Sequence, residues 1–383
     1  MISYHYRDTV SVENIFKSKW IPVEKIFYIF LIIHLICWTI VPSLVRHTLP
    51  MDSIEESIWS HQLEWGYEKN PYLVGFLVRL AIYLGGNADW SFYLFSQISV
   101  VAGFWAIWRL GNNIFTPIYA LIGVLVLEGT QYYNLHAIDF NDNTLEVGLW
   151  PLTILFFYQA LHDKSWKNWI LTGVFAAFGV MTKYYTFVLL LSMFLFVIKN
   201  KQARKCLTQP QWLGGFIAFL LISMPHIFWL FSHNFITITY AFDRVDAKPS
   251  WFNHIYFPSL FVWQQFEAFL PSLILFATLL IPKSSSERVY EAPKPILFYD
   301  REFLFFVGLG PIVITVLLSI LFGINLRAGW GQPLFSLAGL ILLICFCPVI
   351  RKKSFFRFIT LFIAFSFLLL SGYIYSLTTT NIK

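Results

Sequence analysis

The feature that most constrains the fold is a series of apolar runs of about 20 residues, separated by short polar stretches. A helix of this length matches the hydrocarbon core of a bilayer. Composition agrees, because 57% of the 383 residues are hydrophobic and only 13% are charged. A soluble domain carries about 25% charged residues. We therefore predict an all-α polytopic membrane protein.

The apolar runs predict a bundle of about eleven transmembrane helices. One further apolar stretch, residues 71–86, is too short to span untilted and carries Arg79 in its middle. We expect it to lie at the membrane interface, within the first outer loop. The expected spans are residues 26–46, 91–109, 114–131, 145–161, 168–182, 185–198, 212–231, 256–281, 303–323, 334–349 and 356–376.

The positions of lysine and arginine predict the orientation in the membrane. With the N-terminus in the cytoplasm, 19 of the 27 Lys and Arg lie inside and eight lie outside, as the positive-inside rule requires. The outer loops are then residues 47–90, 129–143, 232–255 and 324–333. The eight cations assigned to the outside are Arg46, Lys69, Arg79, Lys183, Arg244, Lys248, Arg327 and Lys383.

The polar segment 282–302 contains three prolines and is the best candidate for a boundary. It would divide a catalytic transmembrane module, residues 1–281 with the first outer loop 47–90, from C-terminal transmembrane helices at 303–383. The four cysteines lack the spacing of a zinc site, so no metal site and no cofactor are predicted. A divalent metal stays compatible with the sequence. Topology accounts for the net charge of +6, so we expect no nucleic-acid partner.

The first outer segment, residues 47–70, combines carboxylates with Trp and Tyr. Asp52 follows the helix-breaking Pro50 and precedes an amphipathic stretch. It can therefore cap a helix, or present its carboxylate at the membrane surface. For the glutamates of this segment, solvated surface charge is the simpler interpretation.

The second outer segment, residues 128–144, ends in polar side chains at the start of an expected helix. The N-terminus of a helix favours anions through its free N–H groups. A plain cap at Asn143 or Thr144 would account for one polar side chain but not for the whole group. The group consists of Asp139, Asn141, Asp142 and Asn143.

Lys183 interrupts the apolar run GVFAAFGVMTKYYTFVLLL. Ionisable groups at membrane depth are costly and usually face protein or water, which makes them functional candidates. The alternative is a lysine that reaches the outer interface beside Tyr184 and Tyr185. As a compact cation, a lysine also suits a phosphate ligand.

Two further outer segments carry charged and aromatic residues, the loop 232–255 and the segment NLRAGWGQP with Arg327 and Trp330. Each is compatible with a solvated turn. However, all these polar features fall on one side of the membrane in the charge-derived topology. We therefore expect carboxylates, carboxamides and cations to face a common outer cavity.

At these residues the sequence resembles the polyprenyl-phosphate-sugar transferases of the GT-C class. Within that class it is similar to the protein O-mannosyltransferases and to the lipid A aminoarabinose and galacturonic acid transferases. The resemblance covers roughly residues 26–345. The segments that carry it, in order, are LPMDSIEESIWSHQLEWGYEKNPYLVGFLVRLAIYLGG, FNDNTLEVGLWPLTILFFYQAL, MTKYYTFVLLL and NLRAGWGQPLF.

The resemblance implies an inverting glycosyltransferase in a bacterial inner membrane, with its active site facing the periplasm. A polyprenyl-phosphate sugar would be the donor, and a membrane lipid, such as a lipid A-like one, or another glycan would be the acceptor. Asp52 would be the catalytic carboxylate that deprotonates or orients the acceptor. The binding residues would be Tyr67, Lys69 and Lys183 for the carrier's phosphate, Arg327 for phosphate or an acidic sugar, Asn141, Asp142 and Asn143 for sugar or acceptor, and Tyr184 beside Lys183.

The sequence departs from the family pattern at several positions. Ser53 stands where the family often has Glu. The stretch after Tyr67 leaves open whether Lys69 or Asn70 takes the family's phosphate-binding position. Asn143, rather than Asp142, can align with the family's second Asp.

A secondary transporter or lipid flippase is the alternative class. It would be expected to show internal repeats and charged or broken helices near the bilayer midplane. Here no such repeat is evident, and the ionisable residues cluster toward one face. No glycine-rich nucleotide loop is present either, which is consistent with a lipid-linked donor.

Overall fold

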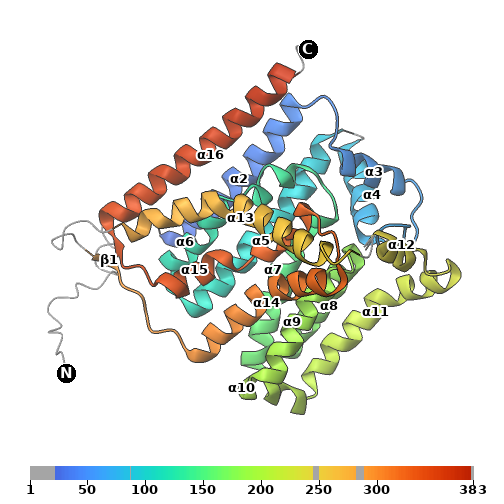
Figure 1. The fold of residues 1–383 in the computed structure, drawn as a ribbon. Helices are drawn as coiled ribbons and strands as arrows, with labels where there is room; N and C mark the ends of the chain where they lie inside the picture. Colours follow the sequence, from blue (N-terminus) through green and yellow to red (C-terminus); the bar gives the residue numbers. More distant parts are fainter. Residues whose placement is uncertain (1–21, 87, 245–249, 282–288, 381–383) are drawn as a thin grey trace.

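The computed structural model describes residues 22–86, 88–244, 250–281 and 289–380, which form an almost entirely helical bundle (Figure 1). In this part of the chain, seven helices are long and apolar enough to cross a membrane, or up to nine if two bent pairs each count as one span. The all-α polytopic fold is thus confirmed. The predicted number of about eleven is compatible with it but is not confirmed.

The long helices are α2 (Val23–Val45), α5 (Trp90–Ile114), α7 (Asp142–Asp163), α8 (Trp166–Thr182), α11 (Gln211–Ser232), α13 (Asn253–Leu280), α14 (Phe298–Phe322) and α16 (Lys352–Thr380). The shorter helices are α3 (Met51–Trp59), α4 (Leu73–Gly85), α6 (Pro117–Leu127), α9 (Thr186–Lys199), α10 (Lys201–Arg204), α12 (Ile236–Arg244) and α15 (Ala338–Phe346). Four 3₁₀ helices, η1 (Gln131–Tyr133), η2 (His136–Ile138), η3 (Lys205–Thr208) and η4 (Ala328–Phe335), and two short strands, β1 (Val289–Glu291) and β2 (Ile350–Arg351), complete the described chain.

Helices α5 and α7 form the centre of the bundle, and α2, α6 and α8 pack around them. Two glycines allow α5 and α7 to approach closely. A Cβ at Gly103 would lie 2.4 Å from the backbone oxygen of Val147, and one at Gly148 would lie 2.5 Å from that of Ser99. Larger side chains would force these helices apart, so small residues set the contact.

Two of the predicted spans differ from the structure. The span expected at 114–131 contains only α6, because the chain leaves the helix after Leu127 and continues through η1 and η2. The span expected at 334–349 belongs to a bent pair, in which η4 and α15 meet at 60°. Pro333 lies within η4, where a proline cannot donate a backbone hydrogen bond and so favours a break.

The predicted short helix at 71–86 is present as α4, and it packs on α3 and α5. Its location at a membrane interface stays a prediction. The same holds for the division at 282–302, of which residues 282–288 lie outside the described chain. Packing crosses that division, because α14 contacts α9, and η4 contacts α7.

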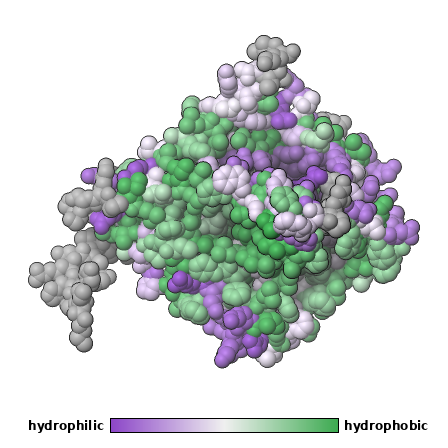
Figure 2. Space-filling model, in the orientation of Figure 1, coloured by the Kyte–Doolittle hydropathy of each residue, from purple (hydrophilic) through white to green (hydrophobic). Residues whose placement is uncertain are grey.

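The bundle has two polar ends with an apolar surface between them. Helices α3, α4 and α12 lie at one end, and α10 and β1 lie toward the other (Figure 1). Figure 2 shows a broad hydrophobic surface across the middle, with hydrophilic surface near α3 and α12 on one side and near α10 on the opposite side. This arrangement is that of a membrane-spanning protein. The predicted cytoplasmic N-terminus lies in residues 1–21, and Lys248 and Lys383 also lie outside the described chain.

The two ends lead to a prediction about membrane orientation. In a background without the native cysteines, a cysteine replacing exposed His61, next to α3, should react with a membrane-impermeant maleimide in intact cells. A cysteine replacing Lys201, on α10, should react only after permeabilisation. Protection of the cysteine at position 61 in intact cells would reverse the orientation predicted from the positive-inside rule.

Candidate active site

A polar cavity of about 350 Å³ opens at the end of the bundle that carries α3. Its walls come from α3 and the segment between α3 and α4, the start of α7, the break between α8 and α9, helix α12, and Arg327 with the start of η4. It therefore joins parts of the chain that are almost 280 residues apart. Its lining is Asp52, Glu55, Glu56, Lys69, Asn70, Asp142, Asn143, Lys183, Tyr184, Tyr185, Tyr240, Ala241, Arg327 and Trp330.

Helix α3 is held against the segment before α7 by the buried Ser53. The backbone N–H of Ser53 donates to Asp139 Oδ1 at 2.9 Å, and its hydroxyl donates to the same oxygen at 2.7 Å. The backbone N–H of Phe140 in turn donates to Ser53 Oγ at 2.9 Å. These contacts join two segments, both predicted to be outer, that the sequence separates by 86 residues, and they fix the first turn of α3.

Asp52 lies in that first turn and does not cap its helix, because no side-chain hydrogen bond caps α3. Its carboxylate instead accepts a hydrogen bond from Asn141 Nδ2 at 3.0 Å. Asn141 Oδ1 accepts from the backbone N–H of Thr144 at 3.0 Å, so Asn141 caps α7. The expectation of a cap at Asn143 or Thr144 was therefore wrong by two or three residues.

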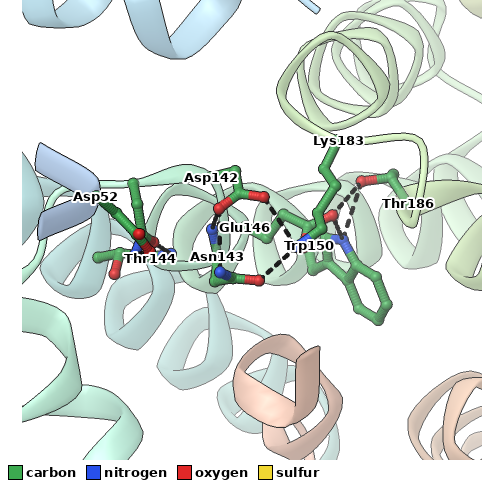
Figure 3. A network of polar contacts seen from close by, with 9 residues as sticks. Asp52, Asp142, Asn143, Thr144, Glu146, Trp150, Lys183 and Thr186 are labelled. Atoms are coloured by element: carbon green, nitrogen blue, oxygen red, sulfur yellow. Dashed lines mark hydrogen bonds and ion pairs between the residues drawn. The ribbon is translucent and has the colours of Figure 1, made fainter. Parts of the chain in front are cut away.

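Lys183 lies where the chain breaks between α8 and α9, and its side chain points toward the start of α7 (Figure 3). Its ammonium lies 2.8 Å from Asp142 Oδ2 and donates to Asn143 Oδ1 at 2.6 Å. It also lies 5.5 Å from the ring centroid of Trp330. The lysine thus faces protein groups inside the cavity, and its depth in the membrane stays a prediction.

The remaining cations of the cavity come from two other segments. Lys69 pairs with Glu55 and lies 5.9 Å from the ring of Trp59. Asn70 lines the same cavity, so both candidates for the family's phosphate-binding position are present. Arg327 also lines the cavity and is exposed.

Tyr184 lies between this cavity and an apolar groove, since it lines both. Its hydroxyl lies 2.5 Å from His226 Nε2. Tyr67, by contrast, is buried outside the cavity lining, where its hydroxyl donates to the backbone oxygen of Gln62 and its ring stacks on Trp59. The structure therefore gives Tyr67 a packing role and does not support its predicted contact with phosphate.

Burial and like charges shift the acidity of the carboxyl groups near α3. Burial, and then the nearby Asp142 carboxylate, raise the pKa of Asp52 above the usual range for an aspartate. Burial raises the pKa of Glu56 well above its ordinary value, and the surrounding acids act in the same direction. A raised pKa moves Asp52 toward the range in which a carboxylate works as a general base.

Sequence reasoning missed two glutamates of the site. Glu56 is only 4% exposed and lines the cavity, although the sequence suggested a solvated charge. Its spacing of four residues from Asp52 was the available signal, because such residues share a helix face.

Glu146 is fully buried one turn after Asp142 (Figure 3). Its Oε1 atom accepts hydrogen bonds from Thr186 at 2.9 Å and Trp150 at 3.3 Å. It therefore connects α7 to the start of α9, next to the break in the chain that carries Lys183. Within the described ranges, no group of three or more His, Cys, Asp or Glu is placed to hold a metal ion.

Comparisons with known proteins agree with this arrangement. Residues 69–229 match the family described as dolichyl-phosphate-mannose-protein mannosyltransferase. No curated protein matched the chain. Among solved structures, ArnT from Cupriavidus metallidurans bound to undecaprenyl phosphate superposes with a TM-score of 0.65, and its apo state with 0.62. Both are 16% identical in sequence, and the matches cover 85% and 84% of this chain.

The chain therefore has the fold of ArnT, and residues 69–229 carry a sequence match to the mannosyltransferase family. Both findings agree with the resemblance that the sequence predicted. The chain spans 60% of the length of each ArnT structure.

The contact between Ser53 and Asp139 leads to a prediction about stability and pH. Burial raises the pKa of Asp139 to about 6, above the ordinary value of about 3.9 for an unfolded chain. The protonated Asp139 carboxyl therefore makes its full contribution to the free energy of unfolding below about pH 4. This contribution is lost as the pH rises through about 6. Asp139→Asn should remove this loss, which corresponds to about 3 kcal/mol.

Thermal unfolding in detergent between pH 4.5 and 7.5 measures the effect. Relative to wild type, Asp139→Asn should gain stability as the pH rises. Asp243→Asn, which changes an exposed aspartate on α12, is the control and should follow wild type. Parallel curves for wild type and Asp139→Asn would show that Asp139 keeps an ordinary pKa.

Proposed function

We propose that this protein is a glycosyltransferase that moves a sugar from a polyprenyl-phosphate carrier to a membrane lipid, of the lipid A kind, or to another acceptor. The observation that carries the proposal is the arrangement of the cavity. It brings a carboxylate of raised pKa, Asp52, together with the cations Lys69, Lys183 and Arg327 at the end of a membrane bundle. Glycosyl transfer from a phosphate needs both kinds of group.

An apolar groove beside the cavity supports a lipid-linked donor. It has a volume of about 510 Å³, lies between α8, α11 and α12, and shares Tyr184 and Ala241 with the polar cavity. A polyprenyl chain could follow the groove while its phosphate reaches Lys183. ArnT, which shares the fold, has been seen with undecaprenyl phosphate bound. The groove is lined by Val180, Met181, Tyr184, Phe187, Phe219, Ser223, His226, Ile227, Leu230, Ile238, Ala241 and Phe242.

The chemistry assigns opposite roles to the two sides of the cavity. Asp52 accepts the proton of the acceptor hydroxyl as its oxygen attacks the anomeric carbon of the sugar. The bond from that carbon to the carrier's phosphate breaks, and the phosphate leaves with the bonding electrons. Lys183 and the other cations stabilise the charge that accumulates on this leaving group. Attack from the face opposite the phosphate would invert the anomeric centre.

Binding of the donor phosphate to Lys183 must replace contacts that this lysine already makes. Its ammonium is already paired with Asp142 and Asn143. A donor phosphate would therefore take the place of Asp142 as the partner of Lys183. Asp142 and Asn143 would then be released toward the sugar, in agreement with the sugar-binding role that the resemblance implies.

Membrane orientation extends the proposal to a cellular location. If the end that carries α3 faces outward, as the charge distribution predicts, transfer takes place at the periplasmic face of a bacterial inner membrane. A lipid-linked donor suits that compartment because its sugar needs no nucleotide there. Mass spectrometry of lipid and glycan fractions from cells with and without the protein would identify the product. A lipid flippase would redistribute the donor between leaflets without producing any new glycosidic bond.

Asp52→Asn is the first test of the mechanism. An amide cannot accept the acceptor's proton, so turnover should fall about 10²–10⁴-fold. Folding should be preserved, because Asn can still accept a hydrogen bond from Asn141. The measurement is turnover of the purified variant with a defined polyprenyl-phosphate sugar in nanodiscs.

The matched control for Asp52→Asn is Glu68→Gln, which neutralises an exposed carboxylate of the same outer loop outside the cavity. It should turn over at the wild-type rate. As the pH is lowered, the turnover of wild type should begin to fall at a higher pH than it would with an ordinary aspartate. The reason is that the pKa of Asp52 is raised. Wild-type turnover by Asp52→Asn would remove Asp52 from the mechanism.

Lys183→Ala is the second test and concerns the donor phosphate. Loss of the cation should weaken donor binding and turnover about tenfold or more, because a charge-assisted contact in a partly buried site is lost. Lys183→Arg should keep part of the activity, since the charge survives while its geometry changes.

Donor titration shows whether the effect of changing Lys183 is specific to this position or follows from the loss of any lysine. Lys201→Ala, which removes an exposed lysine at the other end of the bundle, is the control and should match wild type. If Lys183→Ala left both donor affinity and turnover unchanged, the phosphate site would have to be rebuilt around Lys69 and Arg327.

A further inference from the structure

A second polar cavity, of about 220 Å³, lies at the end of the bundle opposite to the candidate active site. It is formed where α13 and α15 end and α16 begins, near β1 (Figure 1). None of its lining residues takes part in the proposed reaction. They are Leu279, Leu280, Ile281, Phe346, Cys347, Pro348, Val349, Arg351, Lys353, Ser354 and Arg357, and we call this cavity the basic pocket.

The charged side chains among the described lining residues of the basic pocket are all cationic. Arg351, Lys353 and Arg357 contribute three cationic side chains, and no carboxylate occurs among the described residues that line it. These cations follow one another along the start of α16, whose N-terminal turn adds partial positive charge. Cations concentrated in a cavity favour an anionic ligand over cationic or neutral ones.

Hydrogen bonds hold the wall of the basic pocket in place. Arg357 donates from Nη2 to the backbone oxygens of Thr278 at 2.6 Å and Ile281 at 3.2 Å, at the end of α13. Ser354 accepts from the backbone N–H of Arg351 at 3.1 Å and donates to its oxygen at 2.9 Å. The cation of Arg357 is thus held at the wall, and the first turn of α16 is fixed beside it.

The rim of the basic pocket is apolar. Ile281 and Phe346 are 52% and 54% exposed, and Leu280 and Val349 are exposed beside them. In a membrane protein, exposed apolar side chains of this kind contact lipid tails. A ligand that combines an anionic head with acyl chains would satisfy both the wall and the rim.

We propose that the basic pocket binds a phosphate group, carried by an anionic phospholipid of the leaflet opposite to the active site. The volume of the cavity accommodates one phosphodiester head group but not an extended polyanion. Arginine pairs with phosphate through its planar fork of donors, and lysine adds a point charge. Clusters of Lys and Arg between transmembrane helices recognise phospholipid head groups in this way.

The test uses the full-length protein in a neutral detergent and native mass spectrometry. Phosphatidylglycerol and phosphatidylcholine with identical acyl chains are added in parallel, and inorganic phosphate serves as a competitor. Wild type should retain phosphatidylglycerol in preference to phosphatidylcholine. Arg351→Gln/Lys353→Gln should retain about tenfold less phosphatidylglycerol, because two cations near the head group are lost.

The matched control is Lys201→Gln/Lys205→Gln, which removes two exposed lysines at the same end of the bundle but outside the basic pocket. It should bind phosphatidylglycerol like wild type. If the double variant of the pocket failed to fold, the single change of exposed Lys353→Gln should still weaken retention.

The competitor identifies the source of the phosphate. Displacement of the lipid by millimolar inorganic phosphate would support a site for phosphate in general, whereas lipid binding that resists it would support recognition of the whole head group. Equal retention of the two lipids, or equal losses in the pocket variant and the control, would overturn the proposal.

Discussion

The buried side chain of Ser53 holds the candidate site together. Helix α3 has only nine residues, and a helix of that length is marginal by itself. Ser53 joins it to the segment before α7 through Asp139 and Phe140, and this contact sets the position of Asp52 one residue earlier. Ser53 is completely buried, so the glutamate often found in the resembling family would not fit this place unchanged. The position of the carboxylate therefore depends on a neighbour that takes no part in chemistry.

The irregular parts of the bundle lie where they line the cavity or contact protein. The chain leaves α6 through two 3₁₀ turns, it breaks between α8 and α9 at Lys183, and it bends between η4 and α15. Each break frees backbone groups that would be costly if they faced lipid, so such breaks are tolerated only where they line a cavity or contact protein. The break between α8 and α9 supplies Lys183 to the polar cavity, and the start of η4 supplies Trp330. The polar cavity therefore uses one of the three breaks directly.

The sequence predicted the class of fold and much of the cavity, because both follow from local patterns. Apolar runs indicated the spans, and the cost of charge at membrane depth indicated Lys183. It could not predict that Asn141 rather than Asn143 caps α7, because the orientation of Asn141 depends on Asp52, 89 residues away. Nor could it predict that Tyr67 turns to Gln62, or that Glu56 is buried. These outcomes depend on how α3 packs against distant segments, and no local pattern encodes that packing.

Under the proposed function, the ion pairs of the cavity also determine how the donor is recognised. Lys183 already has Asp142 as a partner and Lys69 has Glu55, so a phosphate would exchange one anion for another rather than satisfy an unpaired cation. Such an exchange contributes less net free energy than a contact with an unpaired cation would, because loss of the Asp142 pair and desolvation of the phosphate offset part of the new attraction. Burial of the carrier's chain in the apolar groove beside Tyr184 would then add to the affinity that Lys183 provides. The head group would supply selectivity, since only a ligand that can replace Asp142 gains access to Lys183.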